Sequence, residues 1–113
     1  MKKNDVFSLA LDVWGFDIQS LVLVEEMSEL TKEIIKVQRD SYFKKDVDFT
    51  EMIREMADVQ LMLDQIKHSL NDKERDLFQK EYGRKLNRVK KWLLEELIDY
   101  RIIDLIKSKE FFK

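Results

Sequence analysis

The scarcity of chain-breaking residues is the feature that most constrains the fold. The 113-residue chain contains no proline and only two glycines, the residues on which tight turns and sheet-rich folds depend. Hydrophobic residues make up 44% of the sequence and charged residues 39%, which is enough apolar surface for one modest core and is not typical of disordered proteins. We therefore predict an all-α fold, a bundle of about four to five helices.

Periodic apolar residues predict a first long helix from about Ile18 to about Arg39. The segment WGFD (14–17) precedes it, and Asp17 is a good N-cap residue. The segment 40–48 interrupts the pattern and is expected to form a loop. The predicted apolar stripe of this helix comprises Leu23, Met27, Leu30, Ile34 and Val37.

Two further long helices follow. Asp48 and Glu51 resemble a capping box at the start of the second helix, which reaches about Leu70, and Asn71 gives a similar signal for the third. Gly83 loosens the third helix without ending it. The second helix is apolar on two sides, so one side is expected to meet another subunit. These sides comprise Met52, Met56, Val59, Leu63, Ile66 and Leu70 on one flank, and Ile53, Ala57 and Leu61 on the other.

Charge and composition argue against several classes of protein. The 21 basic and 23 acidic side chains give a net charge of −2, which provides no general attraction to nucleic acid or to an anionic membrane. The chain has no cysteine, so disulfides and thiolate chemistry are excluded. The N-terminus begins like a signal peptide, but Asp12 interrupts its apolar stretch. No run approaches the roughly 20 apolar residues of a membrane span, and we expect a cytoplasmic protein.

Acidic pairs occur at i, i+3 spacing on the first two long helices. Glu26 and Glu29 lie at one margin of the first apolar stripe, Glu55 and Asp58 lie in the same relation to the second, and Glu25 points further outward. If these helices pack antiparallel, four carboxylates converge and require a cation to offset their repulsion. Oxygen ligands without histidine or cysteine favour Mg²⁺, with Mn²⁺ as a substitute. The alternative is that the acids form solvated helix faces, since 23 of 113 residues are acidic.

These motifs resemble a known enzyme family. E-E-x-x-E (residues 25–29) followed by E-x-x-D (residues 55–58) is similar to the motif pair of the MazG-type all-α nucleoside triphosphate pyrophosphohydrolases. The surrounding sequences WGFDIQSLVLVEEMSELTKEI, EMADVQLMLDQI and YGRKLNRVKKWL also resemble that family, in the same order. The resemblance covers roughly residues 12–92 and implies a single MazG-like domain over residues 1–113.

The resemblance also implies an oligomer, a reaction and a set of roles. Members form homodimers or dimers of dimers (homotetramers), and they hydrolyse (deoxy)nucleoside triphosphates to the monophosphate and pyrophosphate, in nucleotide house-cleaning or pool control. By position, Glu26, Glu29, Glu55 and Asp58 would be the Mg²⁺ ligands. The first-motif residues Glu25, Glu26 and Glu29 would be the catalytic group, one of which accepts a proton from the attacking water.

A triphosphate substrate also requires cations and a surface for the base. The third helix carries a basic stripe, although such a stripe is also typical of a solvated face. It comprises Lys80, Arg84, Arg88 and Lys91, with Lys85 beside it in the KLNR stretch (85–88). An aromatic side chain ahead of the first motif suits base stacking, although most aromatics are core or interface residues. The predicted substrate-binding residues are Trp14, Gln19, Lys32, Lys85, Asn87 and Arg88.

Other functions fit the same composition. A non-catalytic helical interaction module needs the charges only for solubility and pairing, and a nucleotide-binding module would keep the fold without turnover. A di-iron carboxylate bundle is disfavoured, because it usually draws on Glu-x-x-His pairs and the chain has none. The preferred base and sugar, the number of metal ions, the choice between dimer and tetramer, and the role of the tail over residues 94–113 are not specified by the sequence.

Overall fold

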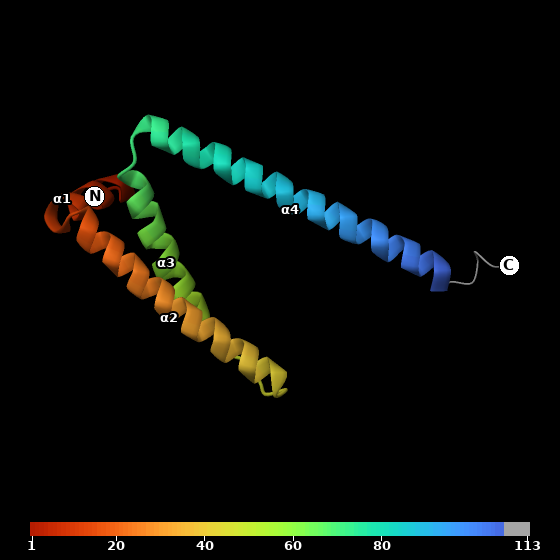
Figure 1. The fold of residues 1–113 in the computed structure, drawn as a ribbon. Coiled ribbons are helices and arrows are strands. Elements are labelled where there is room, and N and C mark those ends of the chain that lie inside the picture. Colours follow the sequence, from red (N-terminus) through yellow and green to blue (C-terminus); the bar gives the residue numbers. More distant parts are fainter. Residues whose placement is uncertain (108–113) are drawn as a thin grey trace. The chain divides into compact units, whose positions relative to one another are not determined.

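The computed structural model describes residues 1–107, which form four α-helices and no strand, so the all-α prediction is confirmed. The helices are α1 (Lys3–Trp14), α2 (Phe16–Tyr42), α3 (Thr50–His68) and α4 (Asp72–Lys107) (Figure 1). The chain divides into two compact units, with α1, α2 and α3 in the first and α4 in the second, which begins at Asp72. The assignment of residues 1–113 to one MazG-like domain stays a prediction.

Helices α2 and α3 form an antiparallel hairpin, because they lie side by side and the chain reverses between them (Figure 1). We call the contact between them the α2–α3 seam, and we define it by a set of buried and half-buried positions on the two helices. On α2 these positions are Gln19, Val22, Glu26, Leu30 and Val37, and on α3 they are Met52, Glu55, Val59, Met62, Gln65 and Ile66.

The seam differs from the predicted apolar stripes in a specific way. Met27 and Met56 were expected to face inward, yet they are 48% and 51% exposed, and Ile34 and Leu63 are exposed beside them. Each helix is rotated so that Glu26 and Glu55 enter the seam instead of lying at its margin. The prediction of the inward face was wrong at these positions, because periodicity identifies an apolar face without specifying which neighbour covers it. The hairpin thus leaves apolar side chains on its surface.

Helix α1 crosses the end of the hairpin, over a stretch to which the sequence pattern assigned no helix. It ends at Gly15, whose φ of 85° is a conformation that L side chains rarely adopt. The Gly15 N–H donates to the carbonyl of Leu11, and the chain then bends by 109° into α2. Phe7 and Ala10 of α1 are buried, which anchors this helix on the hairpin.

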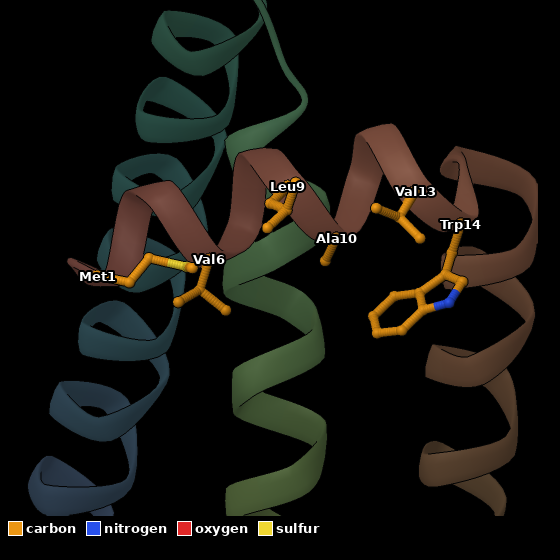
Figure 2. Close-up of a pocket in the computed structure, with 6 residues that line it drawn as sticks. All are labelled: Met1, Val6, Leu9, Ala10, Val13 and Trp14. Atoms are coloured by element: carbon orange, nitrogen blue, oxygen red, sulfur yellow. The ribbon is translucent and has the colours of Figure 1, made fainter.

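Side-chain contacts join α1 to α3. The Ser8 hydroxyl and His68 Nε2 are 2.7 Å apart, and the rings of Phe7 and His68 lie 6.0 Å apart at an angle of 55°. Figure 2 shows the apolar face that α1 also carries, around a pocket of about 260 Å³. This pocket is lined by Met1, Val6, Leu9, Ala10, Val13 and Trp14. Within residues 1–107 no single helix is long and apolar enough to cross a membrane, and α1 and α2 satisfy such criteria only as a bent pair.

Helix boundaries differ from the predicted ones by a few residues. Helix α2 begins at Phe16 and ends at Tyr42, so Asp17 lies in the first turn and is not the N-cap. Helix α3 begins at Thr50, where the Asp48 carboxylate accepts bonds from the backbone N–H and the hydroxyl of Thr50. These bonds lower the pKa of Asp48. The capping-box prediction for Glu51 was wrong, because its carboxylate pairs with the following Arg54.

The second unit contains α4, which starts directly after Asn71, where the third helix was expected to begin. The helix continues through Gly83, as predicted, and extends to Lys107 as one element. None of its residues is buried. The part of the predicted tail over residues 94–107 is therefore helical, and residues 108–113 lie outside the described part of the chain.

Candidate metal centre and adjoining pocket

Three of the four predicted metal ligands converge at the seam. Glu26 on α2 and Glu55 and Asp58 on α3 each bring one carboxylate oxygen within 4.8 Å of the other two. Glu55 and Asp58 are one turn apart on α3, so they reach the same place from one helix. Glu26 reaches it from the neighbouring helix, because α2 and α3 pack side by side. Glu26 and Glu55 are half-buried, whereas Asp58 is exposed. We call these three residues the acidic cluster.

Glu55 is the least satisfied member of the acidic cluster. Its Oε2 atom is buried and has no hydrogen-bond partner among the residues described. Burial raises the pKa of the Glu55 carboxyl, and the neighbouring charges of Asp58 and Glu26 raise it further. The closeness of the Glu26 carboxyl and the charge of Glu29 act in the same direction. The fold thus holds Glu55 where its charged form is disfavoured unless a cation is nearby.

The two remaining acidic predictions lie outside the cluster. Glu29 is exposed and is not one of the three converging residues, although its charge still reaches Glu55. Glu25 is exposed as well, in agreement with its outward position on the helical wheel. Glu26 is therefore the one first-motif glutamate that belongs to the acidic cluster, and Glu25 and Glu29 lie outside it.

A second group of polar residues lies further along the same seam. Gln19 and Gln65 are each only 6% exposed, and the Gln65 Nε2 amide donates to the Gln19 Oε1 carbonyl. We call these residues the amide pair. Sequence reasoning selected Gln19 and missed Gln65, whose only signal was its position seven residues after Asp58 on the same face of the helix.

The amide pair borders a pocket of about 430 Å³ between α2, α3 and the end of α1. Trp14, predicted as a base-stacking residue, is 57% exposed and contributes to its wall. The lining residues are Trp14, Ile18, Gln19, Val22, Met62 and Gln65. We call this space the seam pocket.

The predicted phosphate-binding residues are all exposed. Lys85, Asn87 and Arg88 lie on α4, in the second unit, and Lys32 lies on α2 one turn after the first motif. The Arg88 guanidinium lies 5.2 Å from the centre of the Trp92 ring, a cation–π contact. Of these four residues, Lys32 is the one that belongs to the same compact unit as the acidic cluster.

Another member of the basic stripe has a partner on its own helix. The Arg84 guanidinium pairs with the Glu81 carboxylate at 2.7 Å, and this bond and charge lower the pKa of Glu81. The positive charges of Lys85 and Arg88 lower it slightly more. Arg84 is therefore engaged within α4, as expected for a residue of a solvated charged face.

The residues present fit a small divalent cation. The acidic cluster offers only carboxylate oxygens, the ligand type preferred by Mg²⁺ and Mn²⁺. The buried and unpartnered Glu55 Oε2 is an acceptor that a cation would satisfy. Exposed acidic groups are common without a metal, so the unsatisfied buried atom is the more informative observation.

Comparisons with family models, with curated proteins and with solved structures find no match to this chain. The MazG-type resemblance stays a prediction from the sequence motifs.

Proposed function

We propose that this protein is a Mg²⁺-dependent nucleoside triphosphate pyrophosphohydrolase that releases the nucleoside monophosphate and pyrophosphate. The observation that carries the proposal is the acidic cluster, in which Glu55 has a buried oxygen without a partner. The order of the two acidic motifs in the sequence supports the same reading. A solvated helix face would not require any carboxylate oxygen to be buried and unsatisfied.

Glu26, Glu55 and Asp58 would hold the cation, and Glu29 would join them from the next turn of α2. When bound, Mg²⁺ supplies Lewis-acid stabilisation of charge on the phosphate oxygens. Without a cation, the three or four negative carboxylates would repel a triphosphate. Their role in the proposal is therefore to hold the cation that offsets this repulsion. A first-motif glutamate whose carboxylate keeps part of its negative charge beside the cation can accept a proton from the attacking water.

We further propose that the active protein is a homo-oligomer. Met27, Ile34, Met56 and Leu63 form exposed apolar positions on both helices of the hairpin, and large exposed apolar surfaces mark interaction sites. A second copy of the same hairpin is the simplest cover, since a two-fold interface uses the same patch on both subunits. Met56→Glu should lower the mass measured by light scattering, and an unchanged mass would contradict this interface.

The decisive experiment is product analysis. Purified protein is incubated with Mg²⁺ and a panel of ribo- and deoxynucleoside triphosphates, and the products are separated as monophosphate plus pyrophosphate or as diphosphate plus phosphate. We expect the first pair. Glu26→Gln and Asp58→Asn should abolish the reaction in folded protein, because each removes a ligand of the cation.

Glu33→Gln is the matched control, since it neutralises a half-buried glutamate of α2 outside the acidic cluster. It should leave turnover close to that of the unchanged protein. Absence of turnover on every nucleotide, combined with no stabilisation by Mg²⁺, would contradict the proposal and favour a non-catalytic helical interaction module. Nucleotide binding without hydrolysis would favour a nucleotide-binding module instead.

A further inference from the structure

The amide pair has unused hydrogen-bonding capacity. One bond joins Gln65 Nε2 to Gln19 Oε1, and within the described chain neither side chain makes another hydrogen bond. This leaves the Gln65 Oε1 acceptor and the Gln19 Nε2 donor without protein partners. Neither atom is sealed from solvent, because Glu55 Oε2 is the one fully buried side-chain atom without a partner in the described residues. One amide nitrogen and one amide oxygen, both without any protein partner, are thus available from two otherwise buried side chains.

These two groups border the seam pocket, which also has an aromatic wall. Trp14 projects from the end of α1 (Figure 2) and lines the same pocket as Gln19 and Gln65. The remaining walls are apolar, from Ile18, Val22 and Met62. An apolar slot with one aromatic side and a fixed donor and acceptor suits a flat heterocycle that carries its own acceptor and donor.

The pocket lies at a suitable position relative to the acidic cluster. Gln19 precedes Glu26 by seven residues on α2, and Gln65 follows Asp58 by seven residues on α3. Seven residues correspond to about two helical turns, or roughly 10 Å along each helix. Because the helices are antiparallel, both steps lead in the same direction along the seam. That separation is on the scale of the sugar and first phosphate that join a nucleobase to a triphosphate.

We infer that the amide pair and Trp14 form a nucleobase site. We further infer that the pair can hydrogen-bond both to bases that carry an amino group and to bases that carry an oxo group at the recognised edge. The oxygen and nitrogen of a glutamine amide exchange places when the amide rotates by half a turn. If both amides rotate together, Gln19 donates to Gln65 and the free donor and acceptor change sides. The pair therefore matches the amino edges of adenine and cytosine in one state, and the oxo edges of uracil and guanine in the other.

This inference rests on the proposed function for its substrate, but its test does not require hydrolysis. Nucleosides without phosphate are titrated into the intact protein in EDTA, and the two tryptophan indole N–H signals are followed by NMR. The Trp14 signal is assigned by its loss in Trp14→Phe. We expect adenosine, cytidine, uridine and guanosine all to shift the Trp14 signal.

Two comparisons test the role of the amides. Purine riboside, which lacks the exocyclic group, should bind about tenfold more weakly than adenosine, and Gln65→Met should weaken adenosine by a similar factor. Gln60→Met is the matched control, because it makes the same change on α3 where the Gln60 amide bonds to Asp64 outside the pocket. It should leave nucleoside binding unchanged.

The outcomes separate the two proposals. If no nucleoside shifts the Trp14 signal while triphosphates are hydrolysed, the base site is overturned and the hydrolase stands. If nucleosides bind equally well to Gln65→Met, the amide pair does not read the base. If nucleosides bind as expected and no triphosphate is cleaved, the base site stands and the hydrolase is overturned. If only adenosine and cytidine bind, or only uridine and guanosine, the inference that both amides rotate together is overturned.

Discussion

The α2–α3 seam contains polar side chains in two places, and these places differ in how the side chains are satisfied. Gln19 and Gln65 bond to each other, so each amide offsets part of the cost of burying the other. Glu26 and Glu55 meet as like charges with Asp58 beside them, and one oxygen of Glu55 has no partner. The amide pair is satisfied without a ligand, whereas the like charges of the acidic cluster repel one another unless a cation or a proton offsets them. The comparison shows that burial alone does not indicate whether a polar side chain is already satisfied by a neighbour.

The largest expected effect comes from removing the strained charge. Glu55→Gln should raise the melting temperature in EDTA, because the neutral amide ends repulsion with Asp58 and Glu26. The same change should abolish the stabilisation by Mg²⁺ and lower pyrophosphohydrolase activity by more than about a hundredfold. Thermal melts with and without Mg²⁺, together with product analysis, measure all three quantities.

Glu33→Gln provides the reference for this substitution, since it removes one negative charge from the hairpin outside the acidic cluster. Its Mg²⁺ response should equal that of the unchanged protein. A lower melting temperature for Glu55→Gln in EDTA would show that Glu55 is a stabilising residue, and it would break the distinction between the two places in the seam.

Breaking the amide pair should lower the stability of the protein, whereas Glu55→Gln should raise it in EDTA. Gln65→Met leaves the Gln19 amide buried without its partner, which costs about 1–3 kcal/mol of unfolding free energy. Replacing both glutamines by methionine should recover much of that loss, because no buried amide remains unpaired. Urea unfolding of the two single variants and the double variant measures the coupling, and strictly additive losses would contradict a mutual bond.

The pH dependence of the metal-free protein sharpens the comparison further. The folded state raises the pKa of Glu55 above the ordinary value of 4.5. Its protonation therefore favours the folded state, with the benefit complete below the unfolded pKa and lost as the pH rises through the folded pKa. In EDTA, the stability advantage of Glu55→Gln should be greatest at neutral pH and should narrow as the pH falls towards 4.5.

Gln65→Met is the natural control for this titration, because an amide has no proton to gain. Its stability deficit should stay constant over the same pH range in EDTA. An advantage of Glu55→Gln that does not change with pH would mean that the Glu55 carboxyl keeps its ordinary pKa in the folded protein.

The helices were largely predictable from the sequence, because their signals are local. Apolar periodicity located α2 and α3, and the i, i+3 spacing placed Glu55 and Asp58 on one side of α3. Helix α1 was missed, since its apolar residues were considered only as part of a signal-like segment. The position of Gly15, where φ is positive, is the local signal that ends it.

The pairing across the seam was less predictable, because it depends on how one helix is rotated against another. Glu26 was expected at the margin of a stripe containing Met27, yet Glu26 lies in the seam and Met27 is exposed. Gln65 was missed for a related reason. Glutamine is common on exposed helix faces, and only the alignment of α2 with α3 brings Gln65 to Gln19.

The smallest expected effect concerns Glu29, which tests where the acidic cluster ends. Of the charges that raise the pKa of Glu55, that of Glu29 contributes least, after Asp58 and Glu26. In EDTA, Glu29→Gln should therefore lower the pKa of Glu55 less than Asp58→Asn does, as measured by NMR titration of the Glu55 carboxyl carbon.

The affinity for Mg²⁺ should respond more strongly to Glu29→Gln than the pKa of Glu55 does. Glu29 is exposed, so as a ligand it contributes only when the cation is present. We expect Glu29→Gln to weaken Mg²⁺ binding, measured by calorimetry, by about tenfold or more, although it hardly changes the metal-free protein. Glu25→Gln is the comparison, since Glu25 is also exposed but has no resolved influence on Glu55. If Glu29→Gln leaves the Mg²⁺ affinity unchanged, the cation site consists of the three converging carboxylates alone. Glu29 would then belong to the solvated face of α2, where water satisfies its charge.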